Sequence, residues 1–242
     1  MRAETRHQLK QDRFSRVTLA TAEKTVHWTV EHQNTLIVAG VILLVIVGAV
    51  FGSWYYLDQQ DQKASADLSR AVRTMSAPIQ PPGGQPPEPG TETYPSIKDR
   101  AQVAHKQLQD IADKYPHTHA GEFARYFLGL TSEQMGDNAD AEKNLKGVAS
   151  SRNADLAALA KFALATVYRN TNRTKDAVDI YNSLISKPTQ TVGKTMAQIE
   201  LASTYQEGKQ PEEAKKIYEQ IQKENPGSEA AQIASGRLEQ LK

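Results

Sequence analysis

Residues 164–181 read LATVYRNTNRTKDAVDIY, and two other stretches follow the same pattern over the same length: 128–145, LGLTSEQMGDNADAEKNL, and 201–218, LASTYQEGKQPEEAKKIY. Each stretch begins with leucine and a small residue, has alanine 13 positions after that leucine, and ends with a large residue 4 positions later. The copies are offset by 36 and 37 residues, so only their connections change in length. A fixed internal spacing with variable connections indicates a helix–turn–helix repeat.

The shared positions are those needed to pack two helices closely. In the first copy, Leu128 is followed by Gly129, whose missing side chain lets the second helix of the pair approach the first. Ala141 is the contact point on that second helix, and Leu145, one turn further along the same face, fills the space between helix layers. The other copies place equivalent residues at the same spacing: Leu164, Ala165, Ala177 and Tyr181, then Leu201, Ala202, Ala214 and Tyr218.

Turn-forming residues separate the two helices of every copy. They are Gly136-Asp137-Asn138, Asn170-Thr171-Asn172 and Gly208-Lys209-Gln210-Pro211. Glycine suits the C-terminal cap of a helix, Asn and Asp suit the N-cap, and proline suits the first helical turn. From residue 97 onward there is no run of alternating β-branched residues. We therefore expect an all-α fold, a solenoid of antiparallel helix pairs.

A partial copy precedes the three complete ones. Ala104, Leu108 and Ile111, followed by Pro116, have the spacing of a second helix. They predict a helix over residues 97–115 and place its first helix at 58–77. Residues 78–96, between these two helices, hold seven of the 11 prolines of the chain. Such a composition cannot form a packed core, so we expect an extended loop or linker there.

The pattern also restarts near the C-terminus. Leu238 stands 37 residues after Leu201, beyond Pro226, and no second helix follows it. A repeat domain needs a terminal helix that covers the apolar face of its last repeat. We therefore expect a C-terminal capping helix, with the main solenoid domain over residues 97–242.

An apolar stretch precedes the repeats. Residues 35–57, TLIVAGVILLVIVGAVFGSWYYL, contain no charged side chain. As a helix they would reach about 34 Å, enough for a hydrocarbon core of about 30 Å, and the aromatic residues at the end suit the headgroup level. The alternative, a buried core helix, would need apolar surroundings that no other part of the chain supplies. The sequence predicts a transmembrane helix.

Three glycines lie on one face of this predicted span: Gly40, Gly48 and Gly52. Missing side chains at such spacing allow a second membrane helix to pack closely. A span whose glycines have no specific partner is an alternative that the sequence leaves open.

Residues 1–34 form a polar tail with six basic and four acidic side chains. The tail is too long for the first region of a secretory signal, and the span is too long for its apolar region, so we predict an uncleaved anchor. The basic tail favours a cytoplasmic N-terminus and a C-terminal domain on the opposite side of the membrane. Close to the span, two basic residues precede it and three follow it, so the local count alone does not decide the orientation.

Composition and motifs exclude several kinds of site. The chain has no cysteine, which removes disulfides, thiol catalysis and Cys-ligated metals, and its net charge of +1 does not indicate a nucleic-acid partner. His117 and His119 are too few to hold zinc, and no nucleophile, phosphate-loop, dinucleotide or metalloprotease motif is present. We expect no catalytic residue, cofactor, metal or small-molecule substrate, and therefore no enzyme.

The repeat resembles the tetratricopeptide repeat (TPR), whose signature is W-x2-L-G-x2-Y, then A-x3-F, then P. The match is partial. Pro226 closes the third copy at the expected step, but the Trp and Phe positions hold other residues. The Trp position holds Arg125, Lys161 and Gln198, and the Phe position holds Leu145, Tyr181 and Tyr218.

What this resemblance implies is a concave face, lined by the first helices, that binds a protein partner or an unfolded polypeptide. Counting along the first helices from the buried leucine gives nine candidate partner-binding residues. The aromatic members and the arginine are the expected anchors, although packing between neighbouring helices is an alternative role for the aromatic ones. The candidates are Tyr126, Leu130, Glu133, Phe162, Thr166, Arg169, Ile199, Ser203 and Gln206.

The order of tail, span, helix, loop and repeats is also similar to the single-span, YfgM-type envelope proteins, although no diagnostic motif carries this likeness. The resemblance implies a bacterial inner-membrane location with the C-terminal domain in the periplasm. It also implies an ancillary role at the Sec translocon, together with a periplasmic chaperone. A scaffold for another envelope assembly, such as outer-membrane protein insertion, cytochrome maturation or cell division, is the alternative interpretation.

Overall fold

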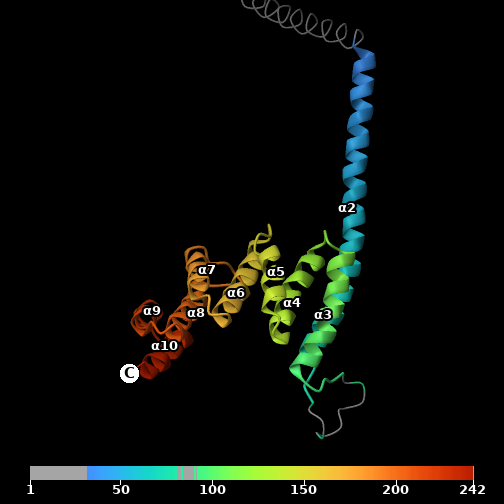
Figure 1. Ribbon diagram of the computed structural model, residues 1–242. Coiled ribbons are helices and arrows are strands. Elements are labelled where there is room, and N and C mark those ends of the chain that lie inside the picture. The colour runs from blue at the N-terminus through green and yellow to red at the C-terminus, as the bar shows by residue number, and fades with distance from the viewer. Residues whose placement is uncertain (1–31, 81–82, 84–89, 91, 242) are drawn as a thin grey trace, which may run out of the picture. The chain divides into compact units, whose positions relative to one another are not determined.

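The computed structural model describes residues 32–80, 83, 90 and 92–241 (Figure 1). Most of the predicted tail, residues 1–34, lies outside these ranges. The chain divides into two compact units, one up to Tyr56 and the other from Leu57 onward. All regular elements in the described ranges are α-helices: α2 Gln33–Ser76, α3 Ile97–Lys114, α4 His119–Met135, α5 Asn138–Val148, α6 Ala154–Asn170, α7 Thr174–Ser186, α8 Lys194–Glu207, α9 Pro211–Glu224 and α10 Glu229–Gln240.

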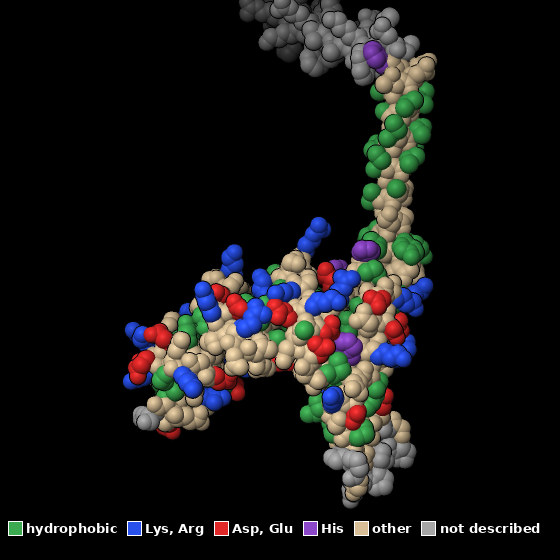
Figure 2. Space-filling view, viewed as in Figure 1, with side chains coloured by type: hydrophobic (Ala, Val, Ile, Leu, Met, Phe, Trp, Pro, Cys, Tyr) green, Lys and Arg blue, Asp and Glu red, His purple; other side chains and the backbone are tan. Residues whose placement is uncertain are grey.

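The part of α2 up to Tyr56 exposes its apolar side chains. Figure 2 shows apolar groups along this stretch, and Leu44 is 72% exposed. A β-carbon added at Gly40, Gly48 or Gly52 would have no atom within 4 Å outside the helix's own nearby backbone. Within the described part of the chain, α2 is the one helix long and apolar enough to cross a membrane.

In the second unit, the remaining residues of α2 pack as the first helix of a pair. Ala64 and Ala71 are fully buried in a cluster with Leu108 and Ile111 of α3. The helix ends at Ser76 because Pro78 cannot continue it. The first repeat is therefore built from two helices separated by the proline-rich stretch.

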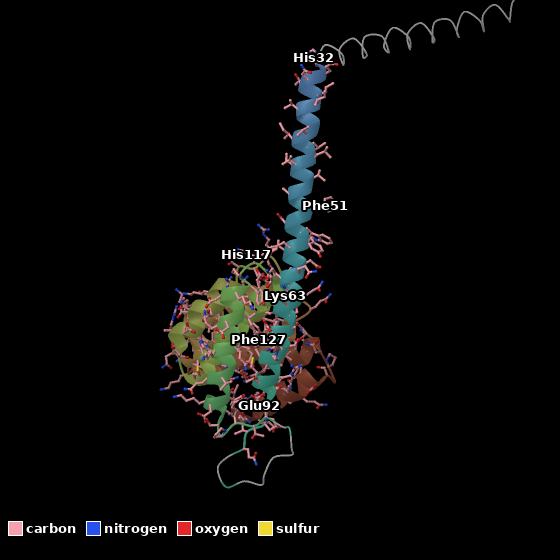
Figure 3. The ribbon with its side chains drawn as sticks, turned by 90° about the vertical axis from the view of Figure 1, so that its right-hand side faces the viewer. His32, Phe51, Lys63, Glu92, His117 and Phe127 are labelled. Carbon is pink, nitrogen blue, oxygen red and sulfur yellow. The ribbon has the colours of Figure 1, made fainter. Side chains whose placement is uncertain are left out.

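The two ends of the proline-rich stretch are joined to each other. The Gln80 amide donates to the Tyr94 carbonyl at 2.8 Å, and the Tyr94 amide donates to the Pro78 carbonyl at 3.1 Å. Arg100 of α3 also donates to the Ala77 carbonyl, at 2.8 Å. Figure 3 shows Glu92 near this junction, with His117 toward the other end of α3. These bonds hold the ends of α2 and α3 together despite the insertion.

Helix pairs then follow one another from α3 to α10 (Figure 1). Every shared alanine of the second helices, and both tyrosines that follow them, are 0% exposed. The all-α solenoid predicted from the spacing is confirmed, and α10 is present at its C-terminal end. Among the described residues the structure contains no strand, only an isolated bridge between Ile79 and Tyr94.

The first turn follows the predicted chemistry, and the other two depart from it. Gly136 caps α4 in the left-handed conformation, with φ 84°, and the Asp137 side chain caps α5 by accepting from the Asp140 amide. In the second turn the N-cap of α7 is Arg173, which makes no side-chain cap bond, and Asn172 takes the left-handed conformation, with φ 61°.

At the third turn, Gly208 has φ −73° and Lys209 takes the left-handed conformation, with φ 59°. Gly208 still caps α8, since its amide donates to the Thr204 carbonyl. It also packs closely, because a β-carbon there would lie 3.0 Å from Cγ2 of Thr174.

Gly129 sets the distance between α4 and α5. A β-carbon at this position would lie 2.5 Å from Cγ of Leu145, whose side chain is fully buried. Real β-carbons essentially never approach another heavy atom that closely. In the later copies, alanine stands at the equivalent position and a tyrosine replaces the branched leucine.

We predict that Gly129→Ala destabilises the protein by about 1–3 kcal/mol, because Leu145 must leave its rotamer or the helices must separate. Helix propensity alone would favour alanine by about 1 kcal/mol. Gly147→Ala is the matched control, since its β-carbon meets nothing within 4 Å and stability should be unchanged or raised. Chemical denaturation of the two variants provides the measurement, and equal effects would contradict the close contact.

Candidate functional site

A groove crosses the first helices of three successive repeats. Its volume is about 410 Å³, and it opens on α6, α8 and α10. Three of the nine candidate residues lie in its wall, one from α6 and two from α8. The lining residues are Arg169, Glu200, Ser203, Gln206, Glu207 and Arg237.

Arg169 joins α6 to α8 in the wall of this groove. Its Nη1 donates to Oε2 of Glu200 at 2.6 Å, and its Nε lies 3.4 Å from Oε2 of Glu207. The Arg169 side chain is only 18% exposed, so water screens its pair with the half-buried Glu200 less than its pair with Glu207, which is 60% exposed. Burial alone would lower the pKa of Arg169, but the bond to Glu200 raises it above its ordinary value. The guanidinium is thus held in place and charged.

Glu133 makes the corresponding connection between α4 and α6. Its Oε1 accepts a hydrogen bond from Nδ2 of Asn170 at 3.0 Å. Burial raises the pKa of the Glu133 carboxyl, and the charge of Arg169 and the bond from Asn170 offset part of that rise. The polar candidates Glu133 and Arg169 therefore both connect neighbouring repeats, and Arg169 also lines the groove.

The tyrosines at the Phe position have hydroxyl partners among the candidates. The Tyr181 hydroxyl lies 3.3 Å from Oγ1 of Thr166, and the Tyr218 hydroxyl lies 3.4 Å from Oγ of Ser203. Both pairs are separated by 15 residues in sequence. The first copy has leucine at both equivalent positions, 130 and 145. The Thr–Tyr and Ser–Tyr pairs were a signal in the sequence that sequence reasoning missed.

The apolar candidates contribute to the core and keep part of their surface open. Tyr126 is half-buried beside Phe127, with ring centroids 5.2 Å apart. Phe162 packs edge-on against Tyr181 at 5.7 Å. Leu130 and Ile199 are likewise half-buried against buried clusters. Each of these side chains therefore packs between helices and also exposes part of its surface on a first helix.

A second polar cluster ties neighbouring repeats together on other helices. Glu142 of α5 accepts from Arg173, at 2.9 Å, and from Tyr168, at 3.1 Å, and pairs with Lys146 at 2.6 Å. The bond from Lys146, with those from Arg173 and Tyr168, lowers the pKa of Glu142 to about 2. Arg173 also stacks on the Tyr168 ring, 3.9 Å from its centroid. Sequence reasoning did not identify this cluster, which joins α5 and α6 to the N-cap residue of α7.

One serine, histidine and aspartate come together, but not in a catalytic order. Ser132 Oγ lies 2.7 Å from Oδ2 of Asp140 and 3.4 Å from Nδ1 of His105. A nucleophilic serine needs histidine between it and the carboxylate, whereas here the fully buried serine occupies the middle. The cluster thus joins α3, α4 and α5 by hydrogen bonds. Within the described ranges, no group of three or more His, Asp or Glu is arranged to hold a metal.

Comparisons with known families agree with the geometry of these helix pairs. A family model described as "Tetratricopeptide repeat-like domain" matches residues 26–183, which is more than half of the chain. The chain belongs to the tetratricopeptide repeat-like domain family. A second model, described as "Tetratricopeptide repeat", matches residues 196–228. TPR domains are protein-interaction scaffolds, and no enzyme family is evident among these matches.

Solved structures show the same fold. Two crystal structures of a putative kinesin light chain from Podosopora anserina, with nearly identical TPR-like repeats, are similar to this TPR chain. The first, a variant form, has a TM-score of 0.57 at 15% identity, covering 75% of this chain and 85% of the other. The second has a TM-score of 0.56 at 16% identity, covering 75% and 86%. No curated protein matches the chain.

We predict that the Thr166–Tyr181 hydroxyl pair stabilises the TPR unit by about 1 kcal/mol. Thr166→Val should destabilise by about that amount, because it leaves the buried Tyr181 hydroxyl without its partner. In the double variant with Tyr181→Phe, the two effects should be clearly less than additive. The measurement is a double-mutant cycle by denaturation, and additive effects would show that the hydroxyls do not interact.

Proposed function

We propose that this TPR protein is a membrane-anchored adaptor whose repeats bind a protein partner or an unfolded polypeptide in the periplasm. The observation that carries the proposal is the groove across α6, α8 and α10, which is lined by the candidates Arg169, Ser203 and Gln206. Its six lining side chains come from three first helices, so a bound segment would contact several repeats at once. That arrangement suits recognition of a polypeptide better than recognition of a compact small molecule.

The proposal that the chain is anchored in a membrane rests on α2. Its apolar side chains up to Tyr56 have no protein surface to cover them, and leaving this many large groups in water is costly. A bilayer supplies the missing apolar surroundings, because a helix satisfies its backbone hydrogen bonds internally. The basic tail supports an N-terminus in the cytoplasm and repeats on the periplasmic side.

The likeness to YfgM-type envelope proteins supports a partner at the Sec translocon and a periplasmic chaperone nearby. A short proline-rich insertion with joined ends is compatible with that arrangement, since it leaves the first repeat intact. The exposed glycines Gly40, Gly48 and Gly52 give α2 a flat face on which another membrane helix can pack. A translocon contact within the membrane is therefore part of the proposal.

Photocrosslinking in intact cells tests the binding surface. A photoreactive residue in place of Tyr126 or Gln206 should capture protein partners, because both side chains lie half-exposed on first helices. Arg169→Ala should weaken capture by about tenfold or more, as loss of an interface anchor does. A probe at Asp179, which is exposed on the second helix α7, is the matched control. Equal capture at Asp179, or none at Tyr126 and Gln206, would contradict the assigned surface.

Protease digestion of spheroplasts tests the orientation. We expect protease added outside to degrade the TPR domain while residues 1–34 stay protected until detergent is added. Protection of the domain would reverse the proposed topology. Replacing residues 35–57 with an unrelated span then separates the two kinds of contact. Loss of the captured partner indicates recognition within the membrane, whereas unchanged capture assigns recognition to the repeats alone.

A further inference from the structure

Hydrogen bonds join the starts of successive first helices along one edge of the second unit. Asp61 of α2 accepts from the Ala120 amide, in the first turn of α4, at 3.1 Å. Glu122, also in the first turn of α4, accepts from Ser151, which lies in the connection to α6, at 3.0 Å. The part of α2 that follows Leu57 therefore lies at the same edge as the starts of α4 and α6.

The same row of bonds continues to the C-terminal repeats. Asp155, in the first turn of α6, accepts from the amides of Gln190 and Thr191, which lead into α8, at 3.1 and 3.3 Å. At the start of α8, Lys194 pairs with Glu224, at the end of α9, at 2.9 Å. We call this surface the helix-start edge. Its connections are residues 115–118, 149–153, 187–193 and 225–228.

Charge is distributed unevenly along the helix-start edge. In its central part, Asp155 is half-buried and its carboxylate is bound by the connection to α8. Arg152 and Lys187 are exposed in the connections that precede α6 and α8, and among the described residues neither forms an ion pair. Exposed carboxylates at the outer parts of the edge are Asp58, Asp113, Glu224 and Glu229. The centre of the edge thus presents two cations that no described carboxylate neutralises.

The two central connections are polar, which distinguishes them from the core of a protein interface. Their exposed residues include Ser150, Asn153 and Gln190, and the apolar Val192 is only 1% exposed. Protein interfaces are built around buried apolar and aromatic anchors. A layer of phosphates needs no such anchors, because guanidinium and ammonium groups bind phosphate through charge-assisted hydrogen bonds.

The helix-start edge lies at the depth of the lipid headgroups when residues 35–57 span the bilayer. Asp61 follows the end of that stretch by four residues, or about 6 Å along a helix. The headgroup region extends about 5–8 Å beyond the hydrocarbon core on each side. Asp61, and the start of α4 that is bonded to it, are therefore within reach of lipid phosphates.

Tethering makes weak contacts at this edge effective. A basic side chain near an anionic membrane surface favours binding by about fivefold. Two such contacts would not hold a free protein on a membrane. The proposed anchor, however, keeps the repeats at the surface, where the local concentration of headgroups is high.

We propose that the helix-start edge rests on lipid headgroups, with Arg152 and Lys187 binding lipid phosphates. The inference rests on the proposed membrane anchor and adds a second point of contact with the bilayer. This contact restricts how far the repeats swing about the end of the span. It also keeps the first helices, which carry the candidate binding surface, close to the membrane.

Headgroup quenching tests this contact. The chain has no cysteine, so Ser150→Cys places a single fluorophore two residues before Arg152. The full chain is reconstituted in phosphatidylcholine vesicles, with or without phosphatidylglycerol, that contain a lipid with a quencher on its headgroup. We expect quenching at least about fivefold stronger than for a fluorophore on Lys175→Cys, in the first turn of α7 at the opposite edge, and phosphatidylglycerol should increase it. Equal quenching at the two positions would overturn the proposal.

Charge reversal provides the matched control. Arg152→Glu combined with Lys187→Glu should lower quenching at position 150 at least about fivefold, whereas Lys175→Glu should leave it unchanged. All three side chains are exposed, so thermal melting should match the parent chain. Unchanged quenching in the double variant would overturn the lipid contact.

An alkaline wash of the vesicles tests the anchor separately. We expect the chain to remain in the vesicles, because an apolar helix that spans the bilayer is not removed with surface-bound protein. Loss of the chain would overturn the anchor and the edge contact together. Retention without quenching at position 150 would overturn only the edge contact, and the anchored adaptor would stand.

Discussion

The close approach of the two helices in each pair is the constraint on which the repeats depend. Gly129 permits it in the first complete copy, where Leu145 fills the space that a β-carbon would occupy. Ala141, Ala177 and Ala214 have no exposed surface on the facing helices. Because dispersion and apolar burial decline steeply when a gap opens, this contact has to recur at fixed spacing along the chain. The connections, which carry no such contact, are free to differ.

Polar contacts then join one pair to the next. Arg169 reaches from α6 to Glu200 of α8, and Glu142 of α5 binds Arg173 at the start of the next second helix. Ion pairs of this kind add little in water but more where burial limits screening, as it does around Arg169. The same arginine lines the groove. Arg169 therefore contributes both to the stability between repeats and to the proposed binding surface. A partner that contacts Arg169 would affect both.

Much of the fold could be predicted from local spacing alone. The helix pairs, the left-handed Gly136 and the proline at the start of α9 all follow from short-range rules that need no partner helix. The third turn shows where such rules stop. Gly208 caps α8 without taking the left-handed conformation, which Lys209 takes instead, and Gly208 lies close to Thr174 of the preceding repeat. At this turn, packing between repeats determined the backbone conformation more than the local preference of glycine did.

For the candidate surface, the sequence by itself determined which residues share a face, because 3.6 residues per turn places the same repeat positions on the same side of every first helix. It also determined that one stretch is apolar enough to span a membrane. Only the tertiary structure decided that Arg169 is held by Glu200 and Glu207, and that Thr166 and Ser203 meet tyrosine hydroxyls. These contacts join residues on different helices. They depend on the distance and rotation between the helices, which the sequence of a single helix does not specify.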